Sequence, residues 1–369
     1  GTVEEAEKVI CLDAATGDVS WRFTANGRVD TPPALHRGLC LFGSRAGSVY
    51  ALRADTGRLV WRLQVGAPQE RIVAYGQLES PWPVPGAVLV SNGVAYFAAG
   101  RQPLADGGIF VFAVDPLSGQ QLWRHQLDSI PQKGFYENSG LEFDSFDILH
   151  QEGDGIALSR WVVAKDGKAI AVDKWNAFAR LDTGEGGGVW VPRGWWTYGP
   201  RHQDRFRGEA PRRPLCVFQG AMLISSLNGT TELFRRDSGL KDREAFNSRW
   251  ITGWEAAQTG SKGGSPFRTS RLAEKARWTA DPFRPAGAPK PGPRVPGKQM
   301  HNDLHAMVLA GDGRLFVVHR DGRLKAITVA DGSVQAETQV ASPAWDALAV
   351  ANRRLYLTTQ AGDVLCIGE

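Results

Sequence analysis

The sequence predicts an all-β fold, a single β-propeller domain over residues 1–369 built from four-stranded antiparallel blades. Three observations predict it. The chain has 369 residues, which is long for one ordinary domain and suits a barrel, a solenoid or a propeller. It contains 43 glycines and 13 tryptophans, which favours many turns and many large packing side chains. A strand–turn–strand unit also recurs along the chain, as in repeat proteins.

The recurring unit occupies residues 9–21, 49–61 and 111–123, and a fourth copy at residues 324–336 lacks the final tryptophan. In each copy an apolar run forms the first strand. An Asp/Thr/Ser–Gly pair supplies the tight turn, because glycine adopts positive φ without steric cost. A second strand follows. The turn glycines of the first three copies are Gly17, Gly57 and Gly119, and the tryptophans are Trp21, Trp61 and Trp123.

A matching pair of strands precedes the repeated units. These pairs occupy residues 33–44, 88–99, 307–318 and 348–359. One pair and one unit together give four short strands in roughly 40–45 residues, which is the blade of a propeller.

The middle of the chain is less regular. Residues 146–184 and residues 215–236 each predict one further blade, with glycines at the hairpin turns. Residues 253–300 are rich in proline and glycine, so we expect them to form a surface insertion that contains no sheet.

The two ends predict incomplete blades. The chain begins with the last two strands of a blade, from Val9, and ends with the first three strands of another. If the ends pair, they close the ring with one strand duplicated. If they do not pair, the chain is an excerpt whose missing blades precede Gly1. We expect about seven blades, with six and eight as the alternatives.

The motif apolar-Ala-Leu-Asp-Ala-x-Thr-Gly-x-x-x-Trp resembles the blade repeat of quinoprotein dehydrogenases, the PQQ-like repeat. Similar repeats build the periplasmic lipoprotein of the outer-membrane β-barrel assembly machinery, which carries no quinone. The resemblance covers residues 9–127 and 302–369 and is degenerate between them. It implies that Trp21, Trp61 and Trp123 dock between neighbouring blades. It also implies a periplasmic or cell-surface location, although this chain shows no signal peptide.

A quinone site would require more than the repeat. The resemblance implies an adjacent Cys-Cys disulfide, a tryptophan floor for the quinone, and Glu, Asn and Asp around Ca²⁺. The four cysteines, Cys11, Cys40, Cys216 and Cys366, are isolated from one another in the sequence. We therefore expect no cofactor, and no PQQ with Ca²⁺ in particular.

Aromatic and arginine side chains outside the repeat are the candidates for ligand binding. Interleaved rings and guanidinium groups can stack on sugars or bind carboxylates. They lie in irregular segments that could meet at the channel, and the alternative is that the tryptophans plug the channel or pack between blades. The candidates are Arg71, Glu79, Trp82, Trp195, Trp196, Tyr198, Arg201, His202 and Arg205.

A short histidine run is the candidate metal site. His301, Asp303 and His305 stand at alternate positions, and alternate residues of a strand share one face. All three side chains could therefore reach one ion. The alternative is a solvated polar entrance to a blade that holds no metal.

No catalytic motif is present: the sequence lacks Gly-x-Ser-x-Gly, His-Glu-x-x-His and the P-loop. A net charge of +4 does not indicate a nucleic-acid partner, and no apolar run is long enough for a transmembrane segment. We expect a noncatalytic propeller that binds a protein or a saccharide through its channel face.

The alternative is an enzyme, which the sequence leaves open. It would be a divergent quinoprotein oxidoreductase, or a propeller hydrolase or lyase with its site at the channel mouth. A third alternative is fusion to, or association with, a separate catalytic domain.

Overall fold

The structure is a computed structural model. It describes residues 7–74, 76–101, 106–127, 149–152, 155–158, 161–168, 185–186, 189–190, 216–219, 222–226, 231–237, 276–285, 287 and 304–368. The chain divides into two compact units, Gly1–Arg180 and Leu181–Glu369, and each is described by itself. The elements of the described residues are β-strands, and no helix among them could cross a membrane. The all-β class is confirmed.

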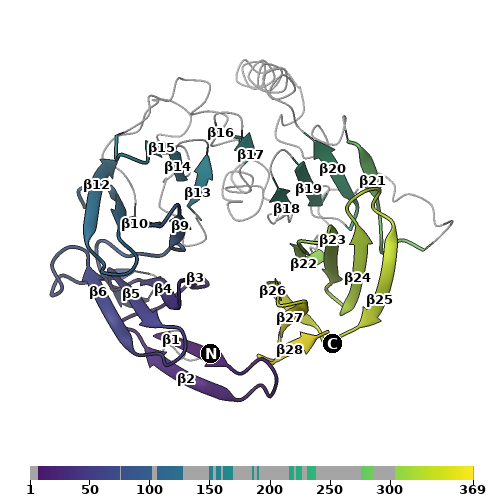
Figure 1. The fold of residues 1–369 in the computed structure, drawn as a ribbon, viewed down its shortest axis with the longest axis horizontal. Helices are drawn as coiled ribbons and strands as arrows, with labels where there is room; N and C mark the ends of the chain where they lie inside the picture. Colours follow the sequence, from purple (N-terminus) through teal and green to yellow (C-terminus); the bar gives the residue numbers. More distant parts are fainter. Residues whose placement is uncertain are drawn as a thin grey trace. The chain divides into compact units, whose positions relative to one another are not determined.

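The first unit contains two complete four-stranded antiparallel blades (Figure 1), with strand orders β3-β4-β5-β6 and β9-β10-β11-β12. The strands of the first blade are β3 (Ala34–His36), β4 (Leu39–Ser44), β5 (Ser48–Arg53) and β6 (Leu59–Gln64). Those of the second are β9 (Leu89–Ser91), β10 (Val94–Ala99), β11 (Ile109–Val114) and β12 (Gln121–Leu127). Smaller sheets are formed by β1 (Lys8–Leu12) with β2 (Val19–Thr24), by β7 (Ile72–Ala74) with β8 (Gln77–Glu79), and by β13 (His150–Glu152), β14 (Gly155–Leu158) and β15 (Trp161–Ala164).

The second unit also contains two four-stranded antiparallel blades, with strand orders β18-β19-β20-β21 and β22-β23-β24-β25. Their strands are β18 (Cys216–Gln219), β19 (Met222–Ser226), β20 (Leu233–Asp237), β21 (Trp278–Ala280), β22 (Leu304–Leu309), β23 (Arg314–His319), β24 (Arg323–Thr328) and β25 (Val334–Gln339). A hairpin and a three-stranded sheet are formed by β16 (Glu185–Gly186) with β17 (Val189–Trp190), and by β26 (Pro343–Ala351), β27 (Arg354–Thr359) and β28 (Val364–Ile367).

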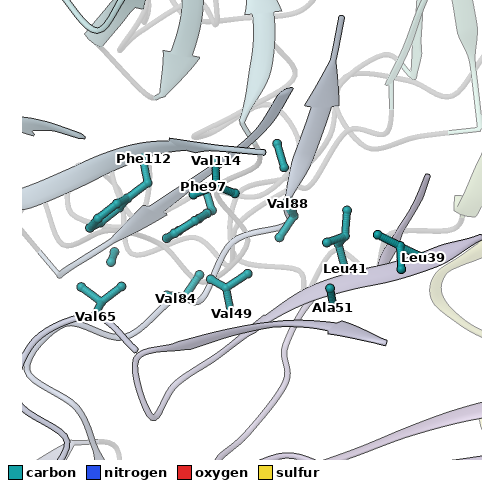
Figure 2. Close-up of a cluster of buried hydrophobic side chains, with 12 residues drawn as sticks. Leu39, Leu41, Val49, Ala51, Val65, Val84, Val88, Phe97, Phe112 and Val114 are labelled. Atoms are coloured by element: carbon teal, nitrogen blue, oxygen red, sulfur yellow. The ribbon is translucent and has the colours of Figure 1, made fainter. Parts of the chain in front are cut away.

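An apolar core lies between the two complete blades of the first unit (Figure 2). The middle strands β4 and β5 are buried at nearly every position, because both of their faces are covered, whereas the outer strand β6 is largely exposed. Phe97 of β10 stacks on Phe112 of β11 with ring centroids 4.8 Å apart. Val49 of β5 packs in the same cluster. Apolar burial of this kind is the main stabilising contribution to the fold.

The tryptophan that ends each repeated unit packs on a turn of the next sheet. Gly119 has φ 73°, and a Cβ there would come within 2.7 Å of the Trp61 ring. The Trp61 indole N–H donates to the carbonyl oxygen of Pro116 at 3.0 Å. The same pair of contacts joins Trp21 to Gly57 and Ala54, and Trp123 to Gly167 and Lys165. Trp61 therefore links the two complete blades, Trp21 links the β1–β2 sheet to the first of them, and Trp123 links the second to the β13–β15 sheet.

One expectation about residues 253–300 is wrong, because residues 278–280 form a strand. β21 pairs with β20 and completes a four-stranded blade. Its Trp278 packs on Gly332, and the indole N–H donates to the carbonyl oxygen of Val329 at 2.9 Å. A three-residue strand has almost no alternation to detect, and the neighbouring proline and glycine runs concealed it.

The ends of the chain carry partial sheets, as the repeat predicts: β1 and β2 form a two-stranded sheet, and β26, β27 and β28 form a three-stranded one. The four-stranded antiparallel blade is confirmed as the building block of a propeller. The number of blades, ring closure and the single domain stay predictions.

Candidate functional site

Several loops of the first unit meet at one end of its blades through backbone hydrogen bonds. The turn between β4 and β5 begins at Arg45, whose N–H donates to the carbonyl oxygen of Arg28 at 2.8 Å and whose carbonyl oxygen accepts from the N–H of Ser80 at 3.0 Å. The N–H of Gly100, after β10, donates to the carbonyl oxygen of Pro83 at 2.9 Å. The segments that lead into each blade therefore contact the turns between the second and third strands of the two blades.

A buried carboxylate joins these loops. Glu79, at the end of β8, is 2% exposed. Both of its oxygens accept from Nη1 of Arg45, at 3.3 and 3.4 Å, and Oε2 also accepts from Nη2 of Arg101. The carboxylate therefore bridges an arginine of one blade and an arginine of the next.

A second carboxylate extends the network. Asp30, in the segment before β3, has a side chain that is 4% exposed. It accepts from Nε of Arg45 and from Nε of Arg28, the latter at 2.5 Å. Three guanidinium groups thus share two buried carboxylates. We refer to Arg28, Asp30, Arg45, Glu79 and Arg101 as the ion network.

Electrostatics hold the ion network together against the cost of burial. Burial acts to lower the pKa of Arg45, but the charges and hydrogen bonds of Asp30 and Glu79 outweigh it, so the pKa is raised above its ordinary value. The Nε atom of Arg101 is buried and has no hydrogen-bond partner. Removing one member of such a buried set leaves another charge uncompensated, which is strongly destabilising.

The arrangement positions loops relative to one another. The carboxylate oxygens of Glu79 and Asp30 accept hydrogen bonds from guanidinium groups that belong to other loops. Charge-assisted hydrogen bonds between separate loops fix those loops in one arrangement. The site is therefore a rigid platform of loops at one end of the blades.

The structure brings two of the predicted ligand-binding residues to the same turn. Glu79 contacts Arg45 as above. Arg71 is exposed, with Nη1 3.4 Å from the carbonyl oxygen of Ala46. Their role in binding a ligand stays a prediction.

The predicted Trp82 makes contacts that hold the protein together. Its ring packs on Gly66, and its indole N–H donates to the carbonyl oxygen of Asp106 at 2.6 Å. These contacts agree with the alternative interpretation of Trp82, in which its ring packs within the protein instead of binding a ligand. The other predicted residues lie outside the described residues: Trp195, Trp196, Tyr198, Arg201, His202 and Arg205.

Sequence reasoning missed Arg28, Asp30, Arg45 and Arg101. They are 2 to 73 residues apart, and singly each looks like a solvated loop residue. One pattern could have found the arginines: Arg45, Arg101 and Arg320 each stand just after the second strand of a blade. An arginine that recurs at the same position of successive blades is therefore the sequence signal that could have identified these arginines.

Of the candidate metal ligands, only His305 is among the described residues. Its Nδ1 lies 3.1 Å from the carbonyl oxygen of Pro343, and its ring meets Trp345 edge-on at 5.8 Å. A carbonyl oxygen only accepts, so Nδ1 is the donor in this hydrogen bond. His301 and Asp303 lie outside the described part, in which no group of three or more His, Cys, Asp or Glu could hold a metal. The metal stays a prediction.

Comparison with known proteins gives a family match for the N-terminal repeats. Residues 2–140 match the family model described as outer membrane protein assembly factor BamB. Quinohemoprotein alcohol dehydrogenase ADH IIB from Pseudomonas putida is 30% identical over 128 residues, which are 32% of this chain and 17% of that enzyme. The matched stretch is thus a small part of the curated relative.

Two solved structures align with the chain over nearly its full length. BamB from Moraxella catarrhalis is 13% identical and aligns over 99% of this chain and 80% of its own, with a TM-score of 0.41. The computationally designed Ika8 protein is 12% identical and aligns over 99% and 91%, with a TM-score of 0.51. At this identity the likeness to the designed protein concerns the fold alone.

Proposed function

We propose that this chain, whose repeats are those of the PQQ-like β-propeller family, is a noncatalytic binding module that holds a partner through the loops at one end of its blades. The observation that carries the proposal is the ion network, in which Glu79 bridges Arg45 and Arg101 from two consecutive blades. Loops fixed in this way present a preorganised surface, so less conformational entropy is lost on binding.

The partner that we propose is a protein, with a saccharide as the second candidate. The family model that matches residues 2–140 is named for an assembly factor of the outer membrane, which supports a protein partner. The same resemblance supports a periplasmic or cell-surface location. The aromatic and arginine residues between residues 190 and 207 remain candidates for the contact surface.

The binding function is tested by affinity capture with the purified chain as bait. Cross-linking and mass spectrometry should recover one stoichiometric partner from the periplasmic fraction of the source cells. Replacement of residues 190–207 by a Gly/Ser linker should weaken the capture if that segment contributes. Recovery of no partner, by the intact chain or by the variant, would contradict the proposal.

The alternative function is a divergent quinoprotein oxidoreductase, and the match to the quinohemoprotein alcohol dehydrogenase favours it. Cys11, Cys40 and Cys366 are free thiols in the described residues, and burial raises the pKa of Cys40 to about 11. These thiols do not fit the adjacent disulfide that the resemblance implies for quinone binding, so we propose that no PQQ is held.

This alternative is tested by adding PQQ with Ca²⁺ and following dye-linked oxidation of alcohols and aldoses. Turnover that disappears in Trp195→Ala or His202→Ala would establish the enzyme and overturn the noncatalytic proposal. A propeller hydrolase or lyase would be detected by screening chromogenic glycosides with the same two variants.

A further inference from the structure

The β7–β8 hairpin has an exposed apolar face. Its strands pair Val73 with Leu78, Ile72 with Glu79 and Ala74 with Gln77. Side chains alternate along a strand, so Val73 and Leu78 share one face, and the other two pairs share the opposite face. Val73 is 76% exposed and Leu78 is 72% exposed. The face that turns toward the protein instead carries the buried Glu79.

The inward face carries the partly buried Ile72, Ala74 and Gln77 beside the buried Glu79, so a carboxylate faces the protein while Val73 and Leu78 face water, against the usual preference for apolar side chains toward the core. A shift of one residue in register would move every side chain to the other face. Such a shift would withdraw Glu79 from Arg45 and Arg101, so the ion network holds the register that leaves the apolar pair in water. A single exposed leucine needs no explanation, whereas two apolar side chains held directly opposite each other form a contiguous patch.

The hairpin is additional to the repeat. It lies in the long link between β6 and β9, residues 65–88, whereas the corresponding link between β2 and β3 spans only residues 25–33. The link is tied to the first blade on both sides of the hairpin, because the N–H of Val65 donates to the carbonyl oxygen of Gly47 and the N–H of Ser80 donates to the carbonyl oxygen of Arg45. The hairpin is thus a separate element that is anchored at its base.

The chemistry of the patch is uncharged. Residues 72–78 contain no Asp, Glu, Lys, Arg or His. The flanking charge of Glu79 is buried in the ion network, and on the other side the exposed Arg71 follows the acidic Glu70 in the sequence. A charged partner surface would lose hydration here and gain no opposite charge, so an apolar and uncharged partner surface matches the patch best.

We propose that the β7–β8 hairpin is a docking element that places Val73 and Leu78 in an uncharged apolar cleft of a partner protein. This inference rests on the proposed binding function and names the chemistry of its contact. A cleft fits better than a second copy of the hairpin, because two side chains on each copy cover far less than the ~800 Å² per partner of a stable interface. A cleft surrounds the two side chains and adds contacts from its own walls.

The test uses random twelve-residue peptides displayed on phage and selected on the immobilised chain. Peptides that also bind the double variant Val73→Ser/Leu78→Ser are removed, and the survivors are synthesised with a fluorophore for anisotropy titration. The matched control is Leu59→Ser/Val60→Ser, which removes two exposed apolar side chains from β6 of the same unit. Circular dichroism of both variants checks that the fold is retained.

The selected peptides should be rich in apolar residues and poor in charge. Their affinity should fall roughly 10- to 100-fold in the hairpin variant and stay within about threefold of the parent in the control. Raising the salt from about 50 mM to about 500 mM should change it less than about threefold, because screening acts only on charge.

Three results would overturn the inference: no peptide that depends on the hairpin, enriched peptides that are charged and salt-sensitive, or a dimer that the hairpin variant dissociates. Affinity capture with the hairpin variant distinguishes an error in the hairpin inference from an error in the proposed binding function. If the hairpin variant still captures the partner, the binding function stands and the hairpin is not its contact.

Discussion

Replacing Glu79 by glutamine should loosen the loops that the ion network joins. Glutamine keeps the shape of the side chain but loses the charge that faces Arg45 and Arg101. Arg45 keeps Asp30, whereas Arg101 has no other carboxylate within the ion network. Breaking a buried ion pair from one side costs about 3–5 kcal/mol, because the remaining charge stays buried without compensation. That is roughly a hundredfold to several-thousandfold change in an opening equilibrium.

Hydrogen exchange measured by mass spectrometry reports this opening locally, which a single unfolding curve of a chain this long does not. Peptides covering residues 72–84 should exchange at least about a hundredfold faster in the variant. Asp55→Asn is the matched control, since its partner Arg53 is exposed and the pair lies on the surface. The double variant Glu79→Leu/Arg101→Met should recover much of the protection, because an apolar pair replaces the ions. Unchanged exchange in Glu79→Gln would refute the reasoning.

Two further predictions concern the repeat. Gly119→Ala should lower the free energy of unfolding by about 2–4 kcal/mol, because alanine is strained at positive φ and its Cβ would overlap the Trp61 ring. Gly17→Ala should lower it by only about 1–2 kcal/mol, because Gly17 also has positive φ but no atom lies within 4 Å of its Cβ position. Urea unfolding compares the two, and equal losses would contradict the packing. The pKa of Asp55 is lowered to about 2, chiefly by hydrogen bonds from Arg53, so its stabilisation exists above the unfolded value near 3.8 and disappears as the pH falls through about 2. NMR titration should give that midpoint, and Arg53→Ala should return it toward 3.8; an unmoved midpoint would exclude Arg53 as the cause.

The blades could be predicted because their information is local. In residues 49–61 the apolar run, the glycine turn and the final tryptophan follow one another, and the structure has β5, the turn and β6 in that order. The three-residue strand β21 could not be predicted, since it is too short to alternate and depends on pairing with β20. Propensity decides long strands, and tertiary pairing decides the shortest ones.

The candidate site was predicted only in part. Glu79 and Arg71 stand in an irregular link, which marks them as candidates, but their partners lie in other segments that the link does not indicate. The ring of Trp82 makes it a candidate for ligand binding, and in the structure that ring packs on Gly66. A tryptophan has the same side chain whether it binds a ligand or packs on a glycine, so its surroundings decide which it does.

By itself, the sequence determined the all-β class, the four-stranded blade and the position of the turns, because strand alternation and glycine φ act over a few neighbouring residues. Only the tertiary structure decided that Asp30, Arg45, Glu79 and Arg101 meet and that the β7–β8 hairpin turns Val73 and Leu78 toward water. Both outcomes depend on charged side chains from separate loops. The Coulomb energy between two such charges depends on their distance in space and on their burial, and a local sequence pattern specifies neither.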